Sequence, residues 1–182
     1  MKKTVLTFGL ISGAVLSAMM VLTLPLKDRI GFDRMEVIGY ASMLAAFLLI
    51  YFGIRSYRDN VAGGSVRFGR ALAVGALIAL VSSLCYVATW EAIFFDPNSD
   101  FIEKYQAHQM KAAIEKGATP AELQKMTEDG KKFAVMYRNP WINAGMTLME
   151  ALPVGLVIAL VSAGILSRKR RSAAGEFVAG VG

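Results

Sequence analysis

One acidic residue inside an apolar segment is the first candidate for a chemical role in this chain. Glu150 is the only charged residue well inside such a segment, and it follows Trp141 by nine residues. At about 1.5 Å per helical residue, it would lie roughly 13 to 14 Å deep in a hydrocarbon core about 30 Å thick. An acid at that depth faces a bundle interior or a water-filled cavity, so we expect a protonated, hydrogen-bonding carboxyl.

Pro153 follows Glu150 by three residues and removes an amide donor, which predicts a helix bend beside the acid. Two interpretations of this polar site are open. In the first, Glu150 bonds to a hydroxyl of the preceding apolar segment and serves assembly of the protein. In the second, it is a proton or cation relay in a small transporter. The candidate site comprises Glu150, Pro153, Asn143, Thr147, Ser82, Ser83, Tyr86 and Thr89.

A second candidate site is formed by arginines between two apolar segments. Arg55 and Arg58 follow one segment, and Arg67 and Arg70 precede the next. Aromatic rings and arginine stems favour the boundary between lipid tails and headgroups, so these residues are expected to seat both segment ends there. They are either an anchor without specificity or a binding site for an anionic lipid headgroup or an acidic partner.

Four apolar segments must position these residues. They cover residues 4–26, 37–54, 71–90 and 141–166, and each is about long enough to cross a membrane as a helix. The composition is 55% hydrophobic, and charged residues lie almost wholly between the segments. We therefore predict an all-α protein with a four-helix transmembrane bundle. Residues 1–171 form a single membrane domain, and residues 172–182 form a disordered cytoplasmic tail.

Small residues recur at every fourth position in three of these segments. In lipid, such stripes let helix backbones approach closely, so the first, third and fourth segments are expected to pack together. Homodimerisation through one stripe is the alternative. The stripes are Gly9, Gly13 and Ser17; Ala71, Gly75, Ala79 and Ser83; and Ala151, Gly155, Ala159 and Ala163.

Residues 97–138, between the third and fourth segments, are predicted to form a helical hairpin outside the membrane. Thr119-Pro120-Ala121-Glu122 has the pattern of a capping box, which starts a second helix after Gly117. Gly130 is the weak point of that helix. The hairpin has three alternative positions: over the outer mouth of the bundle, in the membrane interface, or against a periplasmic partner.

Basic residues indicate the orientation. They divide evenly between the two sides, but those on the side of both termini are concentrated in short segments, opposed only by Asp59 and Glu176. This density favours an orientation with the N- and C-termini inside. The net charge of +6 does not indicate nucleic-acid binding, because the arginines lie at segment ends, close to anionic lipid headgroups.

Catalytic and cofactor motifs are missing from the sequence. Cys85 is the only cysteine, and His108 is the only histidine. No serine triad order, phosphate-binding glycine loop or metal-ligand spacing occurs. We therefore expect no enzyme activity, no cofactor and no metal, with His108 solvated or hydrogen-bonded.

The chain resembles a known family over residues 1 to about 170. The resemblance rests on Gly39-Tyr40, on the block from Tyr51 to Asp59, on Phe68-Gly69-Arg70-Ala71, and on Glu150 with Pro153 and Gly155. These motifs are similar to those of the bacterial membrane proteins grouped as domain-of-unknown-function family 4199. The resemblance implies a small multi-span protein of the bacterial inner membrane, with no assigned activity and no catalytic residue.

Two functions are consistent with these observations. One is a non-catalytic scaffold or accessory subunit that binds a membrane or periplasmic partner, or a second copy, through its hairpin or its small-residue faces. The alternative is a small transporter or proton/cation relay centred on Glu150.

Overall fold

The computed structural model describes residues 1–97 and 99–167 of the chain. The predicted disordered tail, residues 172–182, lies outside the described residues, as do the basic residues 168–171. Within the described ranges there is no strand. The helices are α1 (Lys2–Thr23), η1 (Leu24–Leu26), α2 (Lys27–Ile30), α3 (Phe32–Asn60), α4 (Phe68–Phe94), α5 (Phe101–Glu115), α6 (Pro120–Tyr137) and α7 (Pro140–Leu166).

Four of these helices are long and apolar enough to cross a membrane: the run Lys2–Leu26, α3, α4 and α7. This confirms the predicted all-α class with its four-helix bundle and hairpin. The helices extend beyond the predicted apolar segments. For example, α3 has 29 residues, whereas the apolar segment covers 37–54. Polar turns at each end continue the helix past the apolar part, so the hydropathy pattern underestimates helix length.

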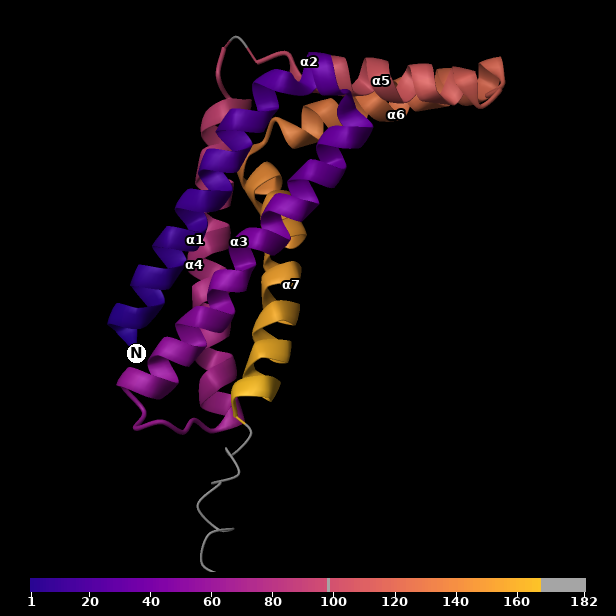
Figure 1. Ribbon diagram of the computed structural model, residues 1–182. Coiled ribbons are helices and arrows are strands. Elements are labelled where there is room, and N and C mark those ends of the chain that lie inside the picture. The colour runs from indigo at the N-terminus through magenta and orange to yellow at the C-terminus, as the bar shows by residue number, and fades with distance from the viewer. Residues whose placement is uncertain (98, 168–182) are drawn as a thin grey trace, which may run out of the picture.

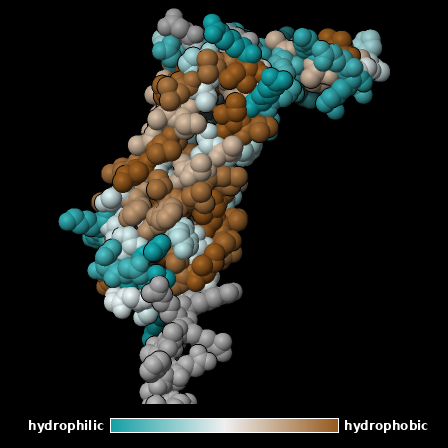
Figure 2. Space-filling view, viewed as in Figure 1, coloured by the Kyte–Doolittle hydropathy of each residue, from teal (hydrophilic) through white to brown (hydrophobic). Residues whose placement is uncertain are grey.

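The outer surface of the bundle is apolar. Leu48, Leu160 and Val161 are 58%, 51% and 57% exposed, and brown hydrophobic residues cover the sides of the bundle in Figure 2. Soluble monomers rarely expose a continuous apolar patch larger than a few hundred Å². Length, composition and surface are therefore those of a membrane protein.

The four long helices run alternately up and down. Figure 1 shows the N-terminus and the α3–α4 connection at one end of the bundle, and α5 and α6 at the opposite end. We call these the arginine end, where Arg55, Arg58, Arg67 and Arg70 lie, and the hairpin end. The helix α4 packs against α1, α3 and α7, with its most extensive contacts to α7 and α1.

Small residues allow α4 to approach both neighbours closely. A Cβ atom added at Gly155 of α7 would lie 2.8 Å from the Cβ of Ala79. One added at Gly13 of α1 would lie 2.6 Å from the Cβ of Cys85. Such separations are shorter than van der Waals contact, so only glycine fits at these positions. The small-residue stripes therefore pack inside the bundle.

The half of the bundle towards the arginine end is filled by large apolar side chains. Phe47, Ile50 and Ile54 of α3 and Ile78 of α4 are each 0% exposed. They form one continuous core with the small residues of α4 and α7.

The predicted capping box starts the second helix of the hairpin. The side chain of Thr119 accepts a hydrogen bond from the amide of Glu122, whose carboxylate accepts from the Thr119 amide at 2.7 Å. These bonds hold the pKa of the Glu122 carboxyl below its usual range. Gly130 does not break α6, and its carbonyl accepts a 2.7 Å hydrogen bond from Gln106 of α5. The helix α5 begins at Phe101, and its N-cap residue Asp100 makes no capping side-chain hydrogen bond.

The packing at Gly155 predicts opposite effects for two substitutions in the same helix. Gly155→Ala should lower stability by about 1 to 3 kcal/mol, because the added methyl group meets Ala79 with no room to move. Gly164→Ala is the matched control, since nothing lies within 4 Å of its Cβ position, and it should be neutral or stabilising by up to about 1 kcal/mol. Thermal unfolding in detergent measures both. Equal shifts for the two variants would contradict the packing.

Candidate functional site

A cavity of about 450 Å³ lies at the hairpin end of the bundle, bounded by α1, α3, α4, α7 and the base of the hairpin. We call it the hairpin-end cavity. The predicted acid Glu150 lines it. Other lining residues include Met20 of α1, Phe32, Asp33, Glu36 and Tyr40 of α3, Tyr86 and Trp90 of α4, Phe101, Tyr105, His108 and Tyr137 of the hairpin, and Met146 and Thr147 of α7.

The cavity exists because α3 is close to its neighbours in only one half of its length. Towards the arginine end, a Cβ at Gly53 would meet the Cδ1 of Ile78 at 2.5 Å. Towards the hairpin end, nothing lies within 4 Å of the Cβ position of Gly39, which lines the cavity. The bundle is therefore solid in one half and hollow in the other.

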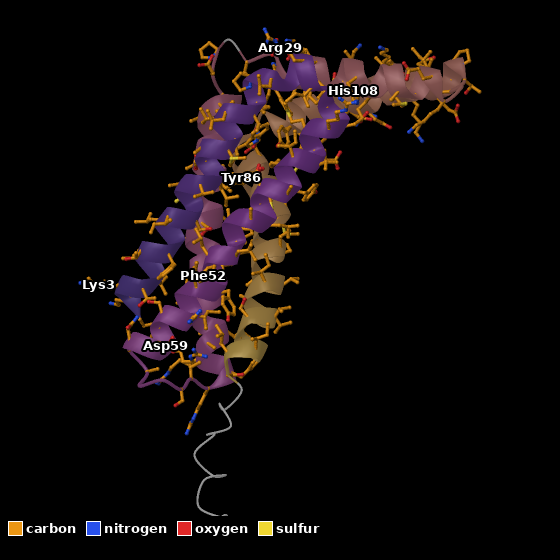
Figure 3. All side chains as sticks on the ribbon, viewed as in Figure 1. Lys3, Arg29, Phe52, Asp59, Tyr86 and His108 are labelled. Atoms are coloured by element: carbon orange, nitrogen blue, oxygen red, sulfur yellow. The ribbon has the colours of Figure 1, made fainter. Side chains whose placement is uncertain are left out.

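Glu150 is exposed in the structure and lines the cavity wall. Tyr86 and Thr147 line the same cavity, so these predicted site residues are brought together with the acid. Within the part of the chain that the structure describes, the Glu150 carboxyl has no hydrogen-bond partner. Figure 3 shows Tyr86 in the half of α4 towards the hairpin end.

Two hydroxyls predicted as partners of Glu150 bond to α1 instead. The Ser82 hydroxyl donates to the carbonyl of Gly9 at 3.1 Å and to that of Ile78 at 2.9 Å. The Thr89 hydroxyl donates to the hydroxyl of Ser17 at 2.7 Å. The structure therefore places both residues in the α1–α4 contact. Among the described residues, the buried Ser83 hydroxyl has no hydrogen-bond partner.

The other site residues predicted in α7 are Asn143, Thr147 and Pro153. Asn143 is fully buried, and its amide donates to the carbonyl of Tyr137 at 3.2 Å, which fixes the junction of α6 and α7. The Thr147 hydroxyl donates to the carbonyl of Asn143 at 3.0 Å. Pro153 lies inside α7, which continues on both sides of it. Asn143 therefore acts at the edge of the site and Thr147 within it.

Aromatic residues line the cavity where the hairpin meets the bundle. The Trp90 ring lies edge-on to Phe101, with centroids 4.9 Å apart, and its Nε1 donates to the Tyr137 hydroxyl at 3.2 Å. Phe94 packs edge-on against Tyr137 at 5.1 Å. Burial in this group raises the pKa of the Tyr137 phenol. The base of the hairpin thus packs against the mouth of the bundle, as in one of the three predicted positions, and the rest of the hairpin projects away from the bundle (Figure 1).

His108 of α5 contacts the start of α3, where it is labelled in Figure 3. Its Nε2 lies 3.1 Å from a carboxylate oxygen of Asp33, and its ring lies 5.2 Å from that of Phe32. Over the described ranges, no group of three or more His, Cys, Asp or Glu side chains could hold a metal ion. His108 therefore attaches the hairpin to α3.

The predicted arginine site lies at the opposite end of the molecule. Asp59 contacts both arginines of α3, with its carboxylate 2.7 Å from Arg58 Nε and 3.7 Å from Arg55 Nε. Arg67 is the N-cap residue of α4, and Arg70 lies in its first turn. Both are exposed. The four arginines thus surround the α3–α4 connection.

Glu36 and the aromatic residues other than Tyr86 are not among the site residues predicted from the sequence. Glu36 lies just outside the predicted apolar segment 37–54, but it is in the second turn of α3 and lines the cavity. The clustering of aromatic residues around Trp90 and Phe101, at the two ends of the α4–α5 connection, was an available signal for a contact between hairpin and bundle.

A comparison with models of protein families identifies the family of this chain. The model described as "Protein of unknown function (DUF4199)" matches residues 7–168. The chain belongs to the DUF4199 family. The DUF4199 match includes α1 from residue 7 onwards, the other three long helices, the hairpin and every residue named above for the cavity, which confirms the resemblance found in the sequence. No match was found among curated proteins, and none was found among solved structures.

Access of water to the cavity can be tested by labelling cysteines in adjacent positions. In a Cys85→Ala background, Glu150→Cys should react with a small water-soluble maleimide in lipid nanodiscs, because position 150 lines the cavity. Ala151→Cys is the matched control and should stay unreactive, because Ala151 is 0% exposed. The extent of labelling is measured by mass spectrometry. Equal reactivity at the two positions would rule out the cavity as described.

Proposed function

We propose that this protein is a non-catalytic cation-handling protein of the bacterial inner membrane: a small transporter or proton/cation relay centred on Glu150. The observation that carries the proposal is the hairpin-end cavity, whose wall includes Glu150. The predicted assembly role of Glu150 required a hydroxyl partner on α4. Of the four candidate hydroxyls, those of Ser82 and Thr89 are bonded to α1, and in the described residues those of Ser83 and Tyr86 make no hydrogen bond to Glu150.

The free-energy cost of placing an acid inside a membrane-spanning helix supports this proposal. An acidic residue near the centre of a spanning helix costs about 2.5 to 3.5 kcal/mol on insertion scales. In the described part of the chain, no hydrogen bond to Glu150 offsets that cost. An acid that faces a hydrated cavity, in contrast, remains solvated and can exchange a proton or pair with a cation. The position of Glu150 therefore favours a role in the cavity over a role in packing.

The cavity occupies only one half of the bundle, and this limits how a cation could cross the membrane. The hairpin half is hollow, whereas Phe47, Ile50, Ile54 and Ile78 fill the other half. A transport cycle would therefore need a second conformation, in which the packed half opens while the hairpin end closes. In the proposed cycle, the conformation with the cavity at the hairpin end is the one that receives the cation.

Orientation is part of the proposal. We place the arginine end in the cytoplasm, because basic residues near span ends favour that side. Both termini are then inside, and the cavity opens towards the periplasm. At the cytoplasmic boundary, the exposed side chains of Arg67 and Arg70, together with Arg55 and Arg58, would bind anionic lipid headgroups.

The hairpin supports a second candidate function, that of a scaffold or accessory subunit. Beyond its base, the hairpin projects away from the bundle (Figure 1), where Ile114 is 57% exposed. The small-residue stripes are used inside the bundle, so the hairpin remains the surface for a membrane or periplasmic partner. Co-purification of one defined protein, lost on deletion of residues 99–138, would support this function.

Substitution of the acid tests the primary proposal. The wild-type protein in vesicles that enclose a pH-sensitive dye should carry protons down an imposed gradient faster than protein-free vesicles. Glu150→Gln should reduce the flux to the protein-free level, because the amide cannot release a proton. Glu128→Gln on the exposed surface of α6 is the control and should keep the wild-type rate.

Two results would contradict the proposal. One is a flux in the Glu150→Gln variant equal to that of the wild type. The other is a wild-type flux, for protons and for monovalent cations, no greater than that of protein-free vesicles.

A further inference from the structure

The hairpin-end cavity is lined by charges of one sign. Its acidic residues are Asp33 and Glu36 of α3 and Glu150 of α7, while the described lining residues include no lysine or arginine. His108 is the only basic side chain among them, and it contacts Asp33 at 3.1 Å. Glu36 and Glu150 therefore give the cavity a negative potential that attracts cations and repels anions.

The same cavity is lined by an unusual number of aromatic rings. They come from α3, α4 and both helices of the hairpin, and contacts between them fix their positions. Trp90 is held by Phe101 and by the Tyr137 hydroxyl, and Phe32 packs edge-on against Tyr105 at 5.8 Å. The aromatic residues of the lining are Phe32, Tyr40, Tyr86, Trp90, Phe101, Tyr105, Phe133 and Tyr137.

Aromatic rings and carboxylates together select a particular kind of cation. A ring face attracts a cation within about 6 Å of its centroid, and the attraction suits quaternary ammonium groups, whose charge is covered by methyl groups. Small hydrated metal ions instead need several oxygen ligands at fixed distances. In the described chain, no cluster of His, Cys, Asp and Glu offers such a set. The lining therefore matches an organic cation better than a metal ion.

The volume of the cavity also fits a small organic ligand. Small-molecule sites in proteins have volumes of about 300 to 1,000 Å³ and are mostly apolar, with a few polar groups that orient the ligand. The hairpin-end cavity, of about 450 Å³, lies within this range. Its apolar and aromatic walls surround two carboxylates, from Glu36 and Glu150, that have no lysine or arginine partner in the lining.

We infer that the hairpin-end cavity binds an organic ammonium ion, with its charge beside Glu150 and Glu36 and its alkyl groups against Trp90 and Tyr86. This inference rests on the proposed function and names the substrate class of the same site. Entry is from the hairpin end, since the core around Phe47 fills the other half of the bundle.

A pair of probes of equal shape isolates the contribution of charge. Choline carries a trimethylammonium group, and 3,3-dimethylbutan-1-ol is its neutral carbon isostere. The chain has two tryptophans, so Trp141→Phe leaves Trp90 as the only tryptophan fluorophore, inside the cavity. Trp141 is 87% exposed and does not line the cavity, so its replacement leaves the site intact. In nanodiscs, choline should change the Trp90 emission in a saturable manner, and the neutral isostere should not.

Substitutions then identify the residues that recognise the charge. Glu150→Gln and Glu36→Gln should each weaken choline binding roughly tenfold, and Glu128→Gln, on the exposed surface of α6, should leave it unchanged. Glu36 is exposed on α3, so its variant keeps the test decisive if Glu150→Gln impairs folding. Binding of the neutral isostere as strong as that of choline, or unchanged choline binding in both variants, would overturn the inference. So would the absence of saturable choline binding.

The outcome is separable from that of the flux experiment, which contains protons and inorganic cations only. Flux that depends on Glu150, without choline binding, would contradict the ligand class and leave the proposed function intact. Saturable choline binding that depends on Glu150, without any flux, would contradict the transport function and support the binding site.

Discussion

Close backbone contact between α4 and its neighbours is the interaction on which the rest of this structure depends. In lipid, apolar side chains gain little by leaving the acyl chains for one another, so helices associate where small residues let them approach. Gly13 brings α1 onto α4, and Gly155 brings α7 onto α4. The hydroxyls of Ser82 and Thr89 then bond across the α1 contact. The helix α4 is thus the centre of the bundle.

The cavity forms because close helix contact does not extend to the hairpin end of α3. The helix α3 meets α4 closely at Gly53, but no neighbour comes within 4 Å of the Cβ position at Gly39. Space therefore opens at the hairpin end, and the aromatic residues around Trp90 and Phe101 hold the hairpin across it. Glu150 lies at the wall of that space. One packing pattern thus produces both the rigid half and the half that can receive a ligand.

Local signals predicted the helices well. The capping box at Thr119, the proline at the start of α7 and the apolar segments all act within a few residues, and the structure contains each of them. The partners of Ser82 and Thr89 were not predictable in the same way. Adjacent residues point about 100° apart around a helix, so the identity of each neighbour depends on how the bundle is arranged. Glu36 was missed because hydropathy marks the apolar part of a helix and not its polar ends.

The central claim is that, in a membrane, α3 stays apart from α7 at the hairpin end and leaves Glu150 facing water. A structure of the protein in lipid nanodiscs, at a resolution that shows side chains and ordered water, tests this most directly. The account predicts a hydrated or ligand-filled space between Glu150, Glu36 and Trp90. A bundle in which α3 packs onto α7 along its whole length, with Glu150 hydrogen-bonded to a neighbouring helix, would contradict it.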